Sequence, residues 1–186
     1  HNQYKLFYEI MSNAKTNYNL SVYEQDWLQK QFSDQDFPME VIGEAENWLQ
    51  SMNDAAHDLG IEIMYCMPNR NDYLISTTLQ AVTSIRVSTD YVTWLREGRF
   101  PEWNIGLNNL LAFSVGLLPT KDVFWSTGEQ PGYKRSGKLT KANEPNPGLT
   151  ALIATLSAGQ VAPGDKLGLM NKTLIMRTCN LDGTLL

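Results

Sequence analysis

The hydrophobic positions of this chain alternate between helical and extended spacing. Apolar residues recur every three or four positions in residues 3–16 and again in residues 43–59, which predicts two helices with one buried face each. A short apolar run follows each of them, in residues 20–27 and 61–67, and such runs predict buried strands. Gly60 stands directly after the second helical segment, at the position where a left-handed residue ends a helix.

The rest of the chain continues the same alternation. Further helices are expected at residues 72–79, 104–115, 147–158 and 169–177, and further strands at residues 81–87, 122–125 and 160–163. This order predicts an α/β fold with parallel strands joined by helical crossovers. Both an open doubly wound sheet and a stretch of a (β/α)8 barrel have this order. No Gly-x-Gly-x-x-Gly motif follows a strand, so the nucleotide-binding form of the open sheet lacks its main support.

Composition and charge narrow the range of functions. The 186 residues are 42% hydrophobic and carry a formal net charge of -5, so the chain lacks the basic surface that binds nucleic acid. No apolar run is long enough to span a membrane. Because there are two histidines and two widely separated cysteines, Cys66 and Cys179, we expect free thiols and neither a structural metal site nor a cofactor.

Two N-glycosylation sequons indicate a secreted protein. They are Asn19-Leu20-Ser21 and Asn171-Lys172-Thr173. We therefore expect glycans on Asn19 and Asn171, with a cytoplasmic location as the alternative.

Acidic side chains follow four of the five predicted strands. They are Glu24 and Asp26 on the first strand, Asp90 on the third, and Asp122 and Asp165 beside the fourth and fifth. An Asp after a strand often caps the next helix, which explains Asp122 or Asp165 taken singly. A helix cap explains Asp26 less well, because no amphipathic helix begins before residue 43. Two carboxylates facing each other across the mouth of a barrel are the arrangement that glycosidases use, and Asp26 and Asp90 are suitably placed.

Aromatic residues lie close to these acidic residues in the sequence. They are Trp27, Tyr91, Trp94, Trp103 and Trp125. Aromatic rings at the mouth of a barrel suit the apolar faces of sugars. Core packing or loop anchoring is the alternative role for each ring.

Four motifs occur in an order that is characteristic of one enzyme superfamily. The first two are Ile63-Met64-Tyr65-Cys66-Met67-Pro68-Asn69 and Ile85-Arg86-Val87-Ser88-Thr89-Asp90-Tyr91. The other two are Thr120-Lys121-Asp122-Val123-Phe124-Trp125-Ser126 and Ser157-Ala158-Gly159-Gln160-Val161-Ala162-Pro163-Gly164-Asp165-Lys166-Leu167-Gly168, with Asp182-Gly183 after them. With these motifs the chain resembles the α-galactosidase and raffinose synthase superfamily of retaining glycosidases. In its raffinose synthase branch, the matching motifs are Cys-Met-Ser, Arg-x-Ser-x-Asp-aromatic, Asp-Trp-Asp-Met-Phe-x-Ser and Gly-Gly-Pro-x-Tyr-x-Ser-Asp-Lys-x-Gly.

The resemblance extends from about residue 7 to the end. It implies a (β/α)8 barrel of which this chain supplies the third helix and the fourth to eighth strands. The first strands and any flanking β domains then lie outside residues 1–186, which agrees with a first helix that has no evident N-cap in the sequence. Matched by position, Asp26 is the nucleophile of the fourth strand and Asp90 is the acid/base of the sixth. Substrate contacts are expected from Glu24, Trp27, Cys66, Arg86, Asp122, Trp125 and Asp165.

The implied function is a retaining glycoside hydrolase or transglycosidase that acts on an α-glycoside, for example an α-galactoside. The family usually has Lys-x-Asp at the nucleophile, whereas this chain has Glu24-Gln25-Asp26. A carboxylate thus replaces a cation that binds sugar hydroxyls, so the alternative is a carbohydrate-binding or structural protein without turnover. A small free-standing α/β domain of another role is a third possibility. The expected partners are a carbohydrate and the remaining segment of the barrel, with no nucleic acid and no membrane span.

Overall fold

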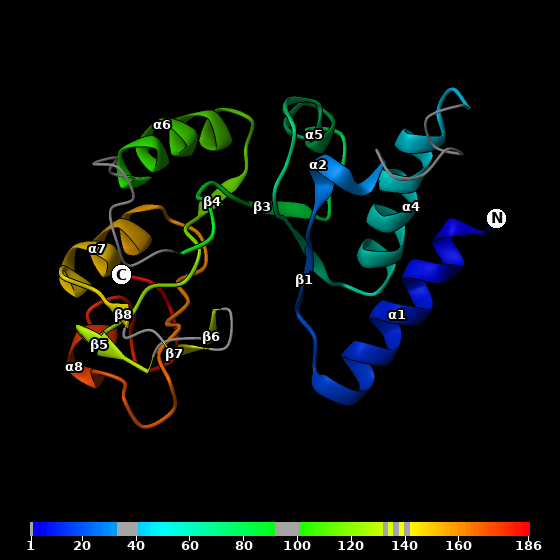
Figure 1. Cartoon of the computed structure of the whole chain (residues 1–186). Coiled ribbons are helices and arrows are strands. Elements are labelled where there is room, and N and C mark those ends of the chain that lie inside the picture. The colour runs from blue at the N-terminus through cyan, green and yellow to red at the C-terminus, as the bar shows by residue number, and fades with distance from the viewer. Residues whose placement is uncertain (1, 33–40, 92–100, 132–133, 136–137, 140–141) are drawn as a thin grey trace. The chain divides into compact units, whose positions relative to one another are not determined.

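The computed structural model describes residues 2–32, 41–91, 101–131, 134–135, 138–139 and 142–186 (Figure 1). The fold is mixed α/β, with a parallel sheet of four strands in the order β1-β2-β3-β4. The chain divides into two compact units. The first comprises His1–Arg86 with Ala112–Leu117, and the second comprises Val87–Leu111 with Leu118–Leu186.

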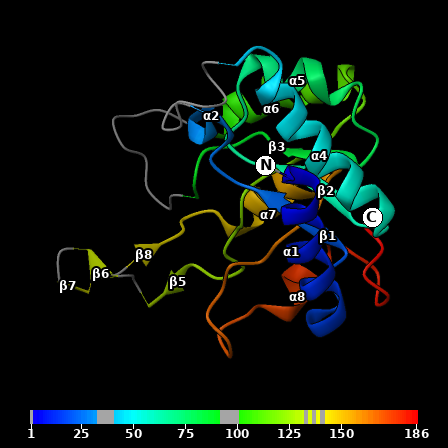
Figure 2. The ribbon, with the colours of Figure 1, turned by 90° about the vertical axis from the view of Figure 1, so that its right-hand side faces the viewer.

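Strands and helices alternate in the first unit. Its elements are α1 (Gln3–Tyr18), β1 (Val22–Gln25), α2 (Leu28–Gln31), α4 (Glu44–Asp58), β2 (Glu62–Tyr65), α5 (Arg70–Ser76) and β3 (Val82–Arg86). β1 pairs in parallel with β2, and β2 pairs in parallel with β3. The connection from β1 to β2 contains α2 and α4, and the connection from β2 to β3 contains α5 (Figure 2). The prediction of parallel strands with helical crossovers is therefore confirmed in this unit.

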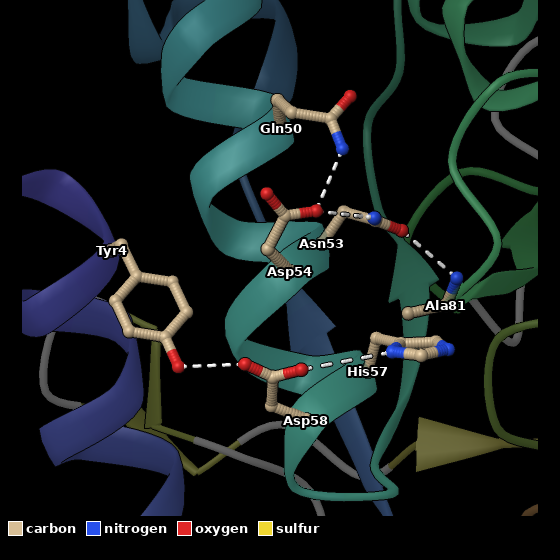
Figure 3. A network of polar contacts seen from close by, with 7 residues as sticks. All are labelled: Tyr4, Gln50, Asn53, Asp54, His57, Asp58 and Ala81. Carbon is tan, nitrogen blue, oxygen red and sulfur yellow. Dashed lines mark hydrogen bonds and ion pairs between the residues drawn. The ribbon is translucent and has the colours of Figure 1, made fainter.

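Helices α1 and α4 lie side by side and contribute to the core of the first unit (Figures 1 and 2). Their buried apolar side chains, together with those of β2, are Phe7, Met11, Leu49, Met52, Ile63 and Tyr65. The ring of Phe7 meets the ring of Trp48 edge-on, with centroids 5.0 Å apart. At the surface, the Tyr4 hydroxyl donates a hydrogen bond to Asp58 at 2.8 Å (Figure 3). Each fully buried large apolar side chain contributes about 1.5–3 kcal/mol to folding.

A buried polar contact ties α4 to the start of β3. Asn53 is buried, and its side-chain oxygen accepts a hydrogen bond from the backbone N–H of Ala81 at 2.9 Å (Figure 3). Its amide group also donates to Asp54 at 3.1 Å. Asp54 accepts a second hydrogen bond from Gln50 at 2.7 Å, on the exposed side of the same helix. Asn53 thus satisfies a backbone group that would otherwise be buried without a partner.

The second unit contains most of α6 and all later elements. They are α6 (Pro101–Ser114), β4 (Leu118–Thr120), β5 (Glu129–Gln130), β6 (Lys134–Arg135), β7 (Lys138–Leu139), β8 (Ala142–Asn143), α7 (Pro147–Leu156) and α8 (Lys172–Ile175). β5 pairs with β8 and β6 with β7, both antiparallel. Phe124 is fully buried with Ala151 and Ala154 of α7, and it forms a parallel bridge with Pro163. A short parallel pairing therefore follows β4 in this unit.

The structure corrects the predicted positions of the last two strands. Residues 122–125 were expected as the fourth strand, whereas β4 comprises Leu118–Thr120. Pro119 interrupts the apolar pattern there, and proline is tolerated because β4 is at the end of the strand order. The expected strand at residues 160–163 is reduced to the single bridge at Pro163.

The ends of several predicted helices also differ. Asn2 caps α1 by accepting a hydrogen bond from the N–H of Lys5 at 2.9 Å, so the expectation of an uncapped first helix was wrong. The last helix was expected at residues 169–177, but α8 begins at Lys172, because Asn171 caps its start, and it ends at Ile175. Residues 129–143, where the hydrophobic pattern predicted no helix or strand, contain β5 to β8. Within the described ranges, no helix combines the length and the apolar character needed to cross a membrane.

We expect Asn53→Ala to lower the free energy of unfolding by about 1–3 kcal/mol, because the N–H of Ala81 would be left buried and unpaired. Gln50→Ala on the same helix is the matched control, since it removes only an exposed contact worth about 0.2–0.5 kcal/mol. Urea denaturation followed by circular dichroism measures both changes. Equal losses in the two variants would contradict the structural role of Asn53.

Candidate functional site

Two rows of side chains cross the strands of the first unit. Successive side chains of a strand point to opposite faces, so residues two positions apart share a face. The register pairs Glu24 with Met64 and Met64 with Ser84. Two positions further along each strand, near its carboxyl end, the same face carries Asp26, Cys66 and Arg86.

Cys66 is the buried centre of this row. Its side chain is fully buried, and its thiol hydrogen-bonds to the Asp26 carboxylate. Burial raises the pKa of the thiol above its ordinary value of 9.0, and the hydrogen bond to Asp26 raises it further. The negative charges of Asp26 and Glu24 act in the same direction, while the positive charge of Arg86 lowers the pKa. The thiol therefore stays protonated at neutral pH and serves as a hydrogen-bond donor instead of a nucleophile.

Asp26 lies at the sharp exit of the chain from β1. Its carboxylate is exposed and accepts a hydrogen bond from the backbone N–H of Trp27 at 2.7 Å. Trp27 has a left-handed backbone, with φ 62°, which is rare for a large residue and is often found at functional sites. The Trp27 ring is 51% exposed and lies 5.2 Å from the ammonium group of Lys30. The turn at Trp27 thus leaves the Asp26 carboxylate open to solvent at the end of the strand.

The first unit thus brings together four of the predicted site residues: Glu24, Asp26, Cys66 and Arg86. Two exposed carboxylates lie near a guanidinium group and a protonated thiol. Carboxylates accept hydrogen bonds from hydroxyl groups, and one carboxylate can also attack an electrophilic carbon. One strand face thus combines two hydrogen-bond acceptors, a cation and a neutral hydrogen-bond donor.

Asp90 belongs to the second unit, where Asp122 binds residues on both sides of it in the sequence. Asp90 itself is exposed. The backbone N–H of Asp122 donates to the Ser88 hydroxyl at 2.8 Å, and the Asp122 carboxylate accepts from the backbone N–H of Tyr91 at 2.6 Å. One contact lies two residues before Asp90 and the other lies one residue after it.

Tyr91 contacts several residues of the second unit through its ring and its hydroxyl. Its hydroxyl donates to the Glu144 carboxylate at 2.5 Å, and its ring meets the Trp125 ring edge-on, with centroids 5.6 Å apart. The ammonium group of Lys121 lies 4.6 Å from the centroid of the Tyr91 ring. Burial and the hydrogen bond to Glu144 raise the pKa of Tyr91 well above its ordinary value. The phenol therefore remains a neutral donor across the physiological range.

Asp165 lies in the same unit and is held by protein groups. Its two oxygens accept hydrogen bonds from the backbone N–H of Ser126, each at 3.0 Å. The side-chain amide of Gln130 donates to it at 2.7 Å. Asp165 therefore shapes the segment that follows Trp125, which is a structural contribution to the predicted site.

Some residues of this network were missed by reasoning from the sequence. Glu144 and Lys121 are both buried, and neither was predicted as a site residue. Glu144 is 53 residues away from its partner Tyr91, in a stretch without helical or strand periodicity. A buried carboxylate in such a stretch has no local signal. Lys121 lies inside one of the four motifs, and this position was the available signal that it belongs to the site.

The two predicted glycosylation sites are exposed. Asn19 ends α1 with a left-handed backbone, and Asn171 caps α8 through its side-chain oxygen. Both positions are open to solvent, as a glycan requires. Of the predicted aromatic neighbours, Trp94 lies outside the described residues.

Both cysteines are free thiols, as expected from their spacing. In the part of the chain that the structure describes, no group of three or more His, Cys, Asp or Glu residues is arranged to hold a metal ion. No family model matches the chain, and no curated protein matches it.

We expect the two cysteines to differ in their reactivity toward iodoacetamide at mildly alkaline pH. Cys66 is buried and its pKa is raised, so its alkylation should be at least about tenfold slower than that of the half-buried Cys179. The variants Cys179→Ser and Cys66→Ser each keep one thiol, and mass spectrometry gives the two rates. After denaturation the rates should become equal. Rapid labelling of Cys66 in the folded protein would contradict the buried site.

Proposed function

We propose that this protein is a retaining glycosidase or transglycosidase that acts on α-glycosides. The observation that carries the proposal is the row of Asp26, Cys66 and Arg86 at the carboxyl ends of three adjacent parallel strands, with Glu24 on the same face. Active sites of (β/α)8 enzymes lie at the carboxyl ends of their strands. The resemblance of four motifs to those of the α-galactosidase and raffinose synthase superfamily supports the same assignment.

We further propose that the chain contributes the fourth to eighth strands of a (β/α)8 barrel. In this arrangement β1, β2, β3 and β4 are the fourth to seventh strands, and the segment that bridges Phe124 at Pro163 is the eighth. β1 is at the other end of the strand order, where the remaining segment of the barrel would pair with it. Secretion with glycans on Asn19 and Asn171 is part of this proposal.

The proposed reaction has two steps and uses one aspartate in each role. In the first step the Asp26 carboxylate attacks the anomeric carbon, the glycosidic C–O bond breaks, and Asp90 gives its proton to the departing oxygen. In the second step Asp90 takes a proton from water, the water oxygen attacks the same carbon, and the bond to Asp26 breaks. A sugar hydroxyl in place of water gives transfer. The Cys66 thiol, which donates to Asp26 in the free protein, would help to orient the nucleophile.

One observation favours a second function, the binding of carbohydrate without turnover. Glu24 is exposed on the same strand face as Asp26, where the superfamily usually has a lysine. A second carboxylate beside the nucleophile repels negative charge and cannot donate hydrogen bonds to sugar hydroxyls in its ionised form. A glycan array combined with an activity screen separates the two functions.

We expect Asp26→Asn to lower kcat on nitrophenyl α-glycosides by at least about a thousandfold, because it removes the nucleophile. Asp90→Asn should lower kcat on methyl α-glycosides by about a hundredfold or more, because a poor leaving group needs the proton donor that this change removes. Asp54→Asn is the matched control, since Asp54 is an exposed residue of α4 and the chemical change is the same. Unchanged turnover in either of the first two variants of the full-length protein would refute the proposal.

We expect Glu24→Lys to raise kcat/KM on nitrophenyl α-galactoside by about tenfold or more. A charge-assisted hydrogen bond to a sugar hydroxyl is worth about 1.5–3 kcal/mol, and the lysine would supply one. Glu24→Gln is the control, because it removes the negative charge without adding a cation. A gain that is equal in both variants would point to charge repulsion as the cause, and no gain in either would show that Glu24 does not limit activity.

A further inference from the structure

Two acidic residues of the second unit bind Tyr91, the residue directly after Asp90, through different groups. Asp122 accepts the backbone N–H of Tyr91, and Glu144 accepts its hydroxyl. The first contact restricts the backbone beside Asp90. The second restricts the Tyr91 side chain and so prevents the segment from rotating about its own axis.

Glu144 is buried and hydrogen-bonded within the protein. Its side chain is only 5% exposed, and both of its carboxylate oxygens are occupied. One accepts the hydroxyl of Tyr91, and the other accepts the backbone N–H of Asn146 at 2.8 Å. A buried carboxylate is costly unless hydrogen bonds compensate for its lost hydration, and these two bonds do so. Glu144 thus links Tyr91 firmly to the start of α7.

Asp122 is occupied in a similar way. Its backbone N–H is bound to the hydroxyl of Ser88, while its carboxylate is bound to the N–H of Tyr91. The sequence predicts Asp122 as a substrate contact. Its hydrogen bonds also connect the residues on both sides of Asp90 to one point of the segment after β4.

We propose that Asp122 and Glu144 are positioning residues that hold Asp90 in place as the acid/base of the reaction. This inference rests on the proposed glycosidase function. A proton donor must lie within hydrogen-bond reach of the departing oxygen, and a misplacement of about 1 Å costs about a hundredfold in rate. Asp90 itself is exposed. Its position is restricted from both sides because Ser88 and Tyr91 are hydrogen-bonded to Asp122.

The first measurement tests whether the hydrogen bonds of Asp122 and Tyr91 hold residues 87–91, and it needs no enzymatic activity. In Asp122→Ala and Tyr91→Phe, amide hydrogen exchange across residues 87–91 should be about tenfold faster than in the wild type. Tyr4→Phe is the matched control, since it also removes a hydrogen bond from a tyrosine hydroxyl to a carboxylate, here Asp58 of α4. If exchange across residues 87–91 is unchanged in both test variants, the proposal is overturned. Ser88→Ala, which removes the acceptor for the N–H of Asp122, replaces Asp122→Ala should that variant not fold.

The second measurement separates a misplaced Asp90 from a general loss of structure or activity. Methyl α-galactoside has a poor leaving group and depends on proton donation, whereas nitrophenyl α-galactoside depends on it far less. We expect Tyr91→Phe and Asp122→Ala to lower kcat about tenfold to a hundredfold on the methyl glycoside and less than about threefold on the nitrophenyl glycoside. Tyr4→Phe should leave both rates unchanged.

The outcomes distinguish a failure of the positioning role from a failure of the proposed function. An equal loss on both glycosides, in a protein whose wild type is active, would overturn the positioning role and leave the proposed function intact. A wild type that cleaves neither these galactosides nor the corresponding glucosides would overturn the proposed function together with the role of Asp90. Faster exchange in that case would still show that Asp122 and Tyr91 hold this segment.

Discussion

The parallel register of β1, β2 and β3 is the constraint on which the candidate site depends. Parallel strands bring their carboxyl ends to one edge, and the side-chain period of two then places Asp26, Cys66 and Arg86 on one face. A slip of one residue in β2 would exchange Cys66 for a neighbour that belongs to the other face. The buried side chains of Ile63 and Tyr65 oppose such a slip, because it would expose them.

Burial then gives the row its chemical character. The Cys66 thiol is shielded from water, so its pKa is raised and it acts as a donor to Asp26. In water the same thiol would ionise near its ordinary value and would be a nucleophile and a site of oxidation. The second unit follows the same principle at Tyr91, whose pKa is raised by burial and by the Glu144 carboxylate. In both places a group that titrates in water becomes a fixed hydrogen-bond donor.

The hydrophobic pattern predicted the first unit better than the second. Helices α1 and α4 and strands β2 and β3 lie within a few residues of their predicted positions, because their apolar side chains recur with the period of the element. β4 was misplaced because Pro119 breaks the pattern of a strand that is only three residues long. The antiparallel pairs between residues 129 and 143 have two residues in each strand, which is too short for any periodicity to appear.

The sequence alone predicted where the first three strands end, which marked Asp26 and Asp90 as candidates, while the resemblance to a glycosidase superfamily added Cys66 and Arg86. These positions follow from local spacing, because strand and helix periods act over only a few residues. The tertiary structure decided the pairing of Tyr91 with Glu144 and the raised pKa of Cys66. Both depend on segments that are distant in the chain and exclude water from the same point, and no local pattern records which segments these are.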